Sequence, residues 1–479
     1  MKPSSEHFNK TVKDTLNNPT IQKNLSGLYN GFHKARIEAS NSTENWESLQ
    51  ELGKKIKDHT ISNLDYYLEQ VHSNVTKNGG QVFFSKDSKS ATKYILDLAK
   101  KNKVKNVIKG KSMISEEMGL NDSLQKEEIE TIETDLGEYI IQMADETPFH
   151  IIAPAIHKSK EDISELFEKN LSMPKSDNPE VLAKEARNQL REKFIQADMG
   201  ITGANFVAAD TGTLILVSNE GNGRMCTSMP KIHIAIMGME KIVPSIEDLS
   251  VFLPLLIRSA TGQMISSYIT EINGPRRNEE IDGPDEFHLI IMDNGRSKLL
   301  QNKDLRESLN CLRCGACLNA CPVYRKIGGH SYGWVYSGPI GAIVSPVLTN
   351  ISDAKDLPFA SSLCGACKEA CPVKINIPRM LLHLRKEISE GNSKKISISS
   401  LFEKIMFKFS TILLLNPKFF RTATKLLSII QKPFLKNGVF EWLPAPLKSW
   451  TKYRTLPAIQ DIPFHKRWVS IFKNSNNND

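Results

Sequence analysis

Seven of the eight cysteines in this 479-residue chain fall into two runs related by a shift of 50 positions. The first reads Cys311-x-x-Cys314-x-x-Cys317-x-x-x-Cys321-Pro322, and the second reads Ser361-x-x-Cys364-x-x-Cys367-x-x-x-Cys371-Pro372. Two-residue gaps aim successive sulfurs at one centre, and in bacterial ferredoxins the cysteine before proline ligates the other centre. The spacing therefore predicts two 4Fe–4S clusters that pass single electrons.

Crossed ligation assigns each cysteine to one cluster. The predicted ligands are, for the first cluster, Cys311, Cys314, Cys317 and Cys371, and for the second, Cys364, Cys367 and Cys321. We expect the Gly-Ala pair between the second and third cysteine of each run to keep bulk away from the cluster.

The second set is one thiolate short, because Ser361 stands at the position equivalent to Cys311. Three outcomes are open. Ser361 or another oxygen ligates the iron, a partner or substrate supplies the ligand, or the unsupported iron is lost and a three-iron cluster remains.

Other uses of the cysteines fit the pattern less well. A structural zinc site usually shows two C-x-x-C pairs separated by a longer stretch, whereas three cysteines at two-residue gaps followed by Cys-Pro favour a cubane cluster. Disulfides are disfavoured because seven clustered cysteines cannot all pair and no secretory signal precedes them. The solitary Cys226 is expected to be a small buried residue.

Charge is concentrated at one end of the chain. Residues 373–479 contain 19 Lys and Arg against 6 Asp and Glu. Because the whole chain has a net charge of +8, the net charge of residues 1–372 is negative. Basic residues alternate there with Phe, Ile and Leu, which predicts basic amphipathic helices that dock an acidic partner or an anionic membrane surface. The other interpretation is a set of solvated helix faces packed on the cysteine region. Nucleic-acid binding is not expected, because no such motif accompanies the charge.

No segment approaches the roughly 20 apolar residues of a membrane span, and the polar start of the chain shows no signal peptide. We therefore expect a cytoplasmic protein, with peripheral contact at the inner face of the membrane left open. The length has room for about three domains.

The remaining pattern predicts an α/β layer between two helical parts. Residues 1–80 have an apolar period of three and four, typical of helices. In residues 81–296, short apolar strands alternate with helices, which indicates a largely parallel sheet. The predicted strands are Val82–Phe84, Asn106–Ile108, Tyr139–Ile141, His150–Ile152, Phe206–Ala209, Thr213–Val217, Lys231–Gly238 and Phe287–Met292.

A polar loop, Asn219 to Arg224, follows one of these strands. Its glycines can aim backbone N–H groups at an anion, and Glu220 is a weak candidate for a catalytic base or hydrogen-bond acceptor. An equally good interpretation is a hairpin loop without a ligand. His233, in the next strand, is expected to be a packed or hydrogen-bonded residue.

Residues 297–390 hold both cysteine runs, and 391–479 form the basic tail. About forty residues separate the runs, more than a compact bacterial ferredoxin needs, and helices are expected at Arg306–Leu312 and Arg379–Ile388. A helical two-cluster ferredoxin domain fits better than a small β-rich one. No dinucleotide or P-loop motif is present. Because an iron–sulfur cluster passes one electron at a time, whereas most organic oxidations remove two, another centre must handle the electron pair.

The stretch Gly200–Gly238, the two cysteine runs and the basic tail together resemble the lactate utilisation protein B family, the iron–sulfur subunit of the bacterial L-lactate oxidation complex. The resemblance implies a sugar-isomerase or CoA-transferase-like α/β domain, a helical ferredoxin domain and a family-specific tail. It also implies a non-catalytic electron-transfer role in oxidising L-lactate to pyruvate, so that lactate serves as carbon source, with two other lactate-utilisation subunits, one cysteine-rich. The resembled proteins also look short of a ligand at Ser361.

Two alternatives remain. The α/β domain itself binds and oxidises a carboxylate, or the chain relays electrons for a different oxidoreductase, such as one acting on disulfides.

Overall fold

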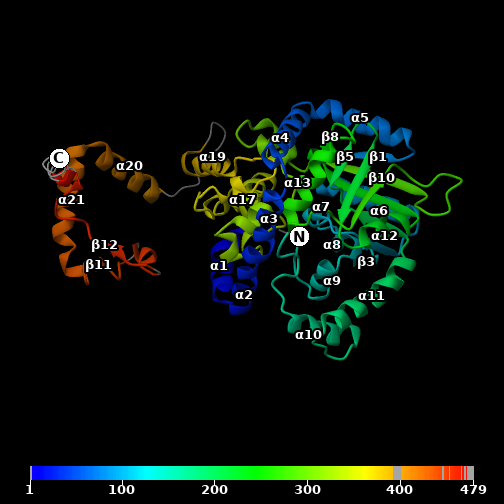
Figure 1. The fold of residues 1–479 in the computed structure, drawn as a ribbon, viewed down its shortest axis with the longest axis horizontal. Coiled ribbons are helices and arrows are strands. Elements are labelled where there is room, and N and C mark those ends of the chain that lie inside the picture. The colour runs from blue at the N-terminus through cyan, green and yellow to red at the C-terminus, as the bar shows by residue number, and fades with distance from the viewer. Residues whose placement is uncertain are drawn as a thin grey trace. The chain divides into compact units, whose positions relative to one another are not determined.

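The computed structural model describes residues 3–391, 401–444, 447–452, 454–464, 466–468 and 471. The chain divides into two compact units, Met1–Gly391 and Asn392–Asp479, which are described separately (Figure 1). The first unit contains the two sheets and both cysteine runs. The predicted basic tail starts at the end of this unit, and its residues 392–400 and 472–479 lie outside the described part of the chain.

A six-stranded parallel sheet forms the centre of the first unit. Its order is β1 (Gln81–Ser85), β10 (Glu286–Met292), β7 (Ile232–Gly238), β4 (Met199–Thr202), β2 (Asn106–Lys109) and β3 (Glu130–Glu133). Every residue of β7 is buried, as expected for a parallel strand covered on both faces. The predicted mixed α/β class with a parallel sheet is confirmed.

Alternate residues of the central strands face different layers. Ile234 and Ile236 pack with helices α6 (Ser88–Lys101), α7 (Met113–Met118) and α8 (Leu120–Gln125). Ala235 and Met237 pack instead with α5 (Leu64–Lys77) and the second sheet. This side-chain period of two places one apolar layer on each face of the sheet.

The second sheet has the order β8 (Ile242–Val243), β5 (Phe206–Ala208), β6 (Thr213–Ser218) and β9 (Tyr268–Ile272). β5 and β6, both predicted as strands, are antiparallel and are joined by the turn at Asp210–Gly212. Gly212 has a φ of 71° there, and a Cβ would come within 2.7 Å of the Val75 backbone.

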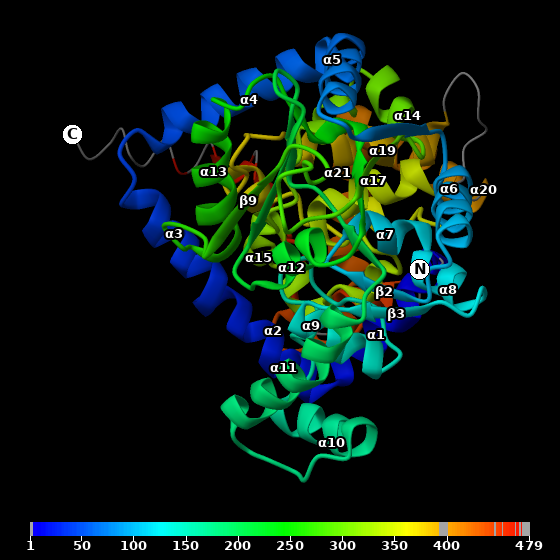
Figure 2. The same cartoon turned by 90° about the vertical axis from the view of Figure 1, so that its right-hand side faces the viewer.

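Two predicted strands are wrong. Tyr139–Ile141 lies in helix α9 (Leu136–Met143), because Asp135 caps its start by accepting from the Glu138 N–H at 3.2 Å. His150–Ile152 forms turns, in which the His150 Nδ1 accepts from the Ile152 N–H at 3.1 Å. Two helices follow, α10 (Lys160–Leu171) and α11 (Pro179–Ile195), which lie at one edge of the unit (Figure 2).

The N-terminal helices pack against the cysteine region rather than against the sheet alone. They are α1 (Phe8–Asn17), α2 (Pro19–Leu28), α3 (Lys34–Asn41) and α4 (Trp46–Ser62). Gln22 donates to the Lys326 carbonyl at 2.8 Å, and the Ser5 hydroxyl donates to the Tyr332 carbonyl at 2.8 Å. Leu25, Leu28 and the buried cysteines of both runs share one apolar core.

The cysteine region is helical, and no strand is assigned in residues 297–391. Its elements are η4 (Arg306–Asn310), α15 (Ala316–Ala320), α16 (Tyr324–Ile327), η5 (His330–Tyr332), α17 (Gly338–Leu348), η6 (Leu357–Phe359), α18 (Ala366–Glu369) and α19 (Ile377–Glu390). The helix expected at Arg306–Leu312 is a short 3-10 helix, and the one expected at Arg379–Ile388 lies within α19.

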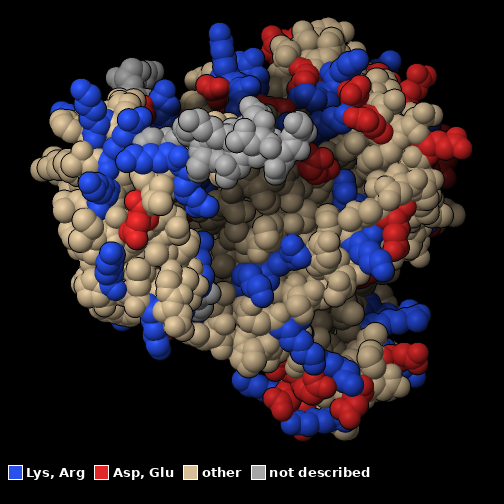
Figure 3. All heavy atoms as spheres, turned by 60° about the vertical axis from the view of Figure 1, so that its left-hand side comes forward, with Lys and Arg blue, Asp and Glu red and all other residues tan. Residues whose placement is uncertain are grey.

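In the second unit, α20 (Leu401–Leu415) and α21 (Pro417–Ile430) precede a two-stranded sheet of β11 (Val439–Phe440) and β12 (Leu456–Pro457). Phe402, Phe407 and Phe409 on α20 are exposed. Figure 3 shows a face of the molecule on which Lys and Arg side chains are interspersed with uncharged residues. Within the described residues, no helix is long and apolar enough to cross a membrane.

Candidate metal centres and an adjoining cavity

The first cysteine run is shaped by one glycine. Gly315, with a φ of 77°, lets the chain turn from Cys314 into α15, which carries Cys317 and ends just before Cys321. A Cβ on Gly315 would lie 3.1 Å from Ile152. Its equivalent in the second run, Gly365, also has positive φ, but a Cβ there would meet nothing within 4 Å. The positive φ of both glycines shows that the turn requires them, and the expectation that they keep bulk away from a cluster stays a prediction.

Four cysteines line one small cavity. They are Cys311, Cys314, Cys317 and Cys371, which come from both runs and match the crossed set predicted for the first cluster. The rest of the lining is mostly apolar and includes Ile340, Val373 and Ile377. The structure thus brings together the four thiols that the sequence spacing assigns to the first cluster, and it places them beside an apolar wall.

Burial controls the protonation of these thiols. It raises the pKa of Cys314 to about 12, with Cys311 adding to the effect, and it raises the pKa of Cys317 further. Because iron binds the thiolate, loading this site must release protons. Backbone N–H groups already point at the sulfurs: Ile375 donates to Cys371 Sγ at 3.3 Å, and Arg313 to Cys311 Sγ at 3.4 Å. Such N–H···S bonds stabilise cluster thiolates.

The second set is more open. Cys321 and Cys367 are buried, whereas Cys364 is exposed. The Ala366 N–H lowers the pKa of Cys364. Burial raises the pKa of Cys367, and Cys321 and Cys364 both add to this rise. The three thiols are therefore neighbours. Among the described residues, no three His, Cys, Asp or Glu side chains are close enough to hold a single metal ion.

Ser361 makes ordinary backbone contacts. Its hydroxyl accepts from the Leu363 N–H at 3.1 Å, and its carbonyl accepts from Arg385 at 2.8 Å. These contacts fix the loop that precedes Cys364 but do not decide between the three outcomes for the missing ligand.

Two side chains from the N-terminal helices reach the first set, and neither was predicted from the sequence. Gln50 of α4 donates to the Cys371 carbonyl at 3.0 Å. Burial lowers the pKa of Arg36 of α3, and Cys314 and Cys371 partly offset that effect, so the guanidinium lies near these thiols. No sequence pattern points to either residue, because their burial and their approach to the cysteines come only from tertiary packing.

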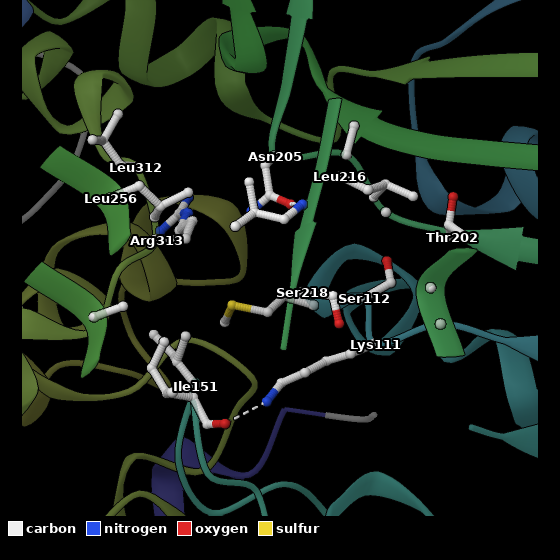
Figure 4. A pocket seen from close by; sticks show the side chains of 18 of the residues that line it. Lys111, Ser112, Ile151, Thr202, Asn205, Leu216, Ser218, Leu256, Leu312 and Arg313 are labelled. Atoms are coloured by element: carbon white, nitrogen blue, oxygen red, sulfur yellow. Dashed lines mark hydrogen bonds between the residues drawn. The ribbon is translucent and has the colours of Figure 1, made fainter. Parts of the chain in front are cut away.

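A larger cavity of about 390 Å³ lies at the carboxyl ends of β2, β4 and β7 (Figure 4). This edge of a parallel sheet is where α/β proteins bind ligands. The side chains in Figure 4 come from both the sheet layer and the cysteine region. Those labelled are Lys111, Ser112, Ile151, Thr202, Asn205, Leu216, Ser218, Leu256, Leu312 and Arg313.

One end of this cavity is strongly charged. Arg296 donates to Glu240 at 2.8 Å and to Glu117 at 2.9 Å, and all three side chains are buried. Burial would raise the pKa of Glu240, but Arg296 and Arg313 outweigh it and hold that pKa at about 2. Burial, together with Arg313, lowers the pKa of Lys241 to about 8.

The predicted loop at Asn219–Arg224 does not close a hairpin. It leads from β6 into helix α12 (Asn222–Ser228), so the hairpin interpretation is wrong. Glu220 lines the cavity and accepts from the Leu136 N–H at 3.3 Å. Its pKa is raised, chiefly because its carboxyl is partly withdrawn from water and then because Asp135 is near.

Two neighbouring predictions are confirmed. Cys226 is fully buried and free, and burial raises its pKa to about 12. His233 is buried and hydrogen-bonds the Thr202 hydroxyl at 2.9 Å.

Three family models match successive parts of the chain. They are the LUD domain at residues 68–292, the 4Fe-4S dicluster domain at 307–375, and the lactate utilisation protein B C-terminal domain at 383–470. The α/β layer joined to the crossed cysteines thus defines an iron–sulfur protein of the dicluster class.

Similar proteins cover almost the whole chain. Lactate utilization protein B of Bacillus licheniformis is 46% identical over 459 residues, 96% of this chain and 95% of that protein. Lactate utilization protein B 2 of Bacillus mycoides is 45% identical over 474 residues, 99% of this chain and 98% of that protein. The chain belongs to the lactate utilization protein B family. A solved DUF162 family protein from Deinococcus radiodurans aligns with 48% of this chain and 98% of its own, at 14% identity and a TM-score of only 0.28.

Proposed function

We propose that this chain is the iron–sulfur electron-transfer subunit in the oxidation of L-lactate to pyruvate, which allows lactate to serve as a carbon source. The observation that carries the proposal is the cavity lined by Cys311, Cys314, Cys317 and Cys371, beside a second set of thiols. Cys317 of the first set and Cys367 of the second interact electrostatically. Such closeness suits electron passage between two centres, and the names of the relatives suggest lactate as the source of electrons.

The donor sets fit iron–sulfur clusters. When bound, a 4Fe–4S cluster takes up and releases one electron at a time. We assign Cys311, Cys314, Cys317 and Cys371 to the first cluster and Cys321, Cys364 and Cys367 to the second, and we propose that the second is incomplete unless a partner or an oxygen supplies its fourth ligand. The chain's own part is to hold both thiol sets and to enclose the first.

The finer architecture is also proposed. We divide the chain into an N-terminal helical segment (1–80), a sugar-isomerase or CoA-transferase-like domain (81–296), a two-cluster ferredoxin domain (297–390) and a helical basic tail (391–479). The partners are two other lactate-utilisation subunits, one cysteine-rich. The exposed phenylalanines and the basic residues of α20 and α21 support a tail that contacts an acidic partner or the inner face of the membrane in the cytoplasm.

The direct test of the electron-transfer role is lactate-dependent reduction of the clusters in the reconstituted complex, followed by electron paramagnetic resonance. The proposal expects cluster signals on adding L-lactate only when all subunits are present. A deletion strain should fail to grow on lactate. Normal growth of that strain on lactate, with loss of a different oxidation, would favour the relay for another oxidoreductase.

A second candidate function is oxidation of a carboxylate by the α/β domain itself, which the 390 Å³ cavity with Glu220 at its wall favours. Glu220→Gln separates the two. A pure relay keeps its rate of lactate-dependent reduction, whereas a domain that uses Glu220 as a base loses roughly a hundredfold or more.

A further inference from the structure

The larger cavity contains a cation with an unused donor. Arg313 lies between Cys311 and Cys314 in the chain, and its side chain is only 10% exposed. Its Nη1 is buried and has no hydrogen-bond partner among the described residues. Figure 4 shows the guanidinium at the cavity wall, beside Leu256 and Leu312. A buried guanidinium nitrogen without an acceptor is costly unless a ligand supplies one.

The charges at this end do not balance. Glu240 faces three cations, namely Arg296, Arg313 and Lys241, and the second buried carboxylate, Glu117, pairs with Arg296. Arg296 holds one of its oxygens at 2.8 Å, whereas Arg313 lies 3.6 Å from the other. Lys241 Nζ donates only a long bond, 3.4 Å, to the Leu312 carbonyl. The Cys311 sulfur offsets part of the positive charge, but among the described residues neither Arg313 nor Lys241 has a carboxylate at hydrogen-bond distance.

The other residues that line the cavity indicate the size and polarity of the rest of the ligand. Ile151, Leu256 and Leu312 form an apolar wall, and Ser112, Asn205 and Ser218 present uncharged polar groups (Figure 4). The volume is within the roughly 300–1,000 Å³ range of small-molecule sites. Glu220 and Asp135 also line the cavity, and because repulsion grows with the charge of the ligand, they oppose a single carboxylate only about half as strongly as a doubly charged phosphate.

We propose that Arg313 and Lys241 bind the carboxylate of a small hydroxy or oxo acid in this cavity, directly beside the first cysteine set. The choice of acid rests on the proposed function, whereas the site rests on the buried Arg313 Nη1, which has no hydrogen-bond partner among the described residues. Arg313 provides a planar fork suited to a carboxylate, and Lys241 adds a point charge.

The test is calorimetric titration of the full-length, iron-loaded chain with pyruvate, L-lactate and inorganic phosphate in turn. Arg313→Gln and Lys241→Met are compared with the wild type. The matched control is Arg325→Gln, because Arg325 is a half-buried arginine of the cysteine region that does not line the cavity. Iron content is measured on every variant.

We expect saturable binding of pyruvate or L-lactate, weakened at least about tenfold by each cavity variant and unchanged in the control. If Arg313→Gln loses iron, Lys241→Met decides the question. Absence of saturable binding to the wild type, binding of phosphate alone, or full affinity in the cavity variants would overturn the inference. The electron-transfer proposal would survive any of these results if lactate still reduced the clusters in the complex.

Discussion

The two cysteine sets are built on the same spacing, yet the structure gives them unequal surroundings. The first has four cysteines around an apolar cavity, and Gln50 and Arg36 from the N-terminal helices reach it. The second has three, with Cys364 exposed and Ser361 bonded to its own loop. A repeat therefore fixes which thiols meet, whereas the segments packed over each set fix how well it is shielded. We expect a robust first cluster and a labile second one.

The largest effect is expected from removing a ligand of the buried set. Cys317→Ala should prevent the first cluster from forming, so that about four of some seven to eight irons are lost. It should also lower the melting temperature, because the cavity at the centre of the cysteine region is then left unfilled. Iron analysis and thermal unfolding measure both. Cys226→Ala is the control, since it also removes a buried cysteine but should keep all the iron. An unchanged iron content in Cys317→Ala would contradict the ligand assignment.

A smaller loss is expected from the exposed set. Cys364→Ser should remove up to about three or four irons while the first cluster and the fold remain, because its side chain faces solvent rather than the core. Iron content, visible absorbance and circular dichroism separate cluster loss from unfolding. Equal destabilisation by Cys364→Ser and Cys317→Ala would break the contrast between the two sets.

Ser361→Cys should make the two sets more alike. The added thiol completes the repeat, so we expect a gain of about one iron per chain where the wild type holds a three-iron centre. Electron paramagnetic resonance of the oxidised protein distinguishes three-iron from four-iron clusters. Ser362→Cys, one position along the same loop, is the matched control. A wild-type spectrum without any three-iron signal would mean that the fourth ligand is already present.

The least disruptive test compares the thiols without iron. The Ala366 N–H lowers the pKa of Cys364, whereas burial raises the pKa of Cys314 to about 12. At pH 8, iodoacetamide should therefore alkylate Cys364 at least about tenfold faster. With rising pH the Cys364 rate should reach its plateau earlier than that of an ordinary thiol, while that of Cys314 keeps rising towards about pH 12. Mass spectrometry of the folded, iron-free chain gives both rates, and equal rates would show that the buried set is open without iron.

The sequence predicted the parts of this molecule that depend on local spacing. The grouping of Cys311, Cys314 and Cys317 with Cys371 follows from short gaps and a repeat, and the buried strands follow from apolar runs. Tyr139–Ile141 was assigned to a strand because three apolar residues in a row do not separate strand from helix, and the Asp135 cap decided the matter. The cavity could not be predicted, because Arg313 and Lys241 meet only through tertiary packing.

The central claim is that this chain holds two thiolate-bound iron–sulfur clusters. It is tested most directly by counting iron, acid-labile sulfide and zinc in the full-length protein after reconstitution without oxygen. We predict about seven to eight irons per chain with a similar amount of sulfide, and a brown protein. A colourless protein that contains stoichiometric zinc and no labile sulfide would contradict the account.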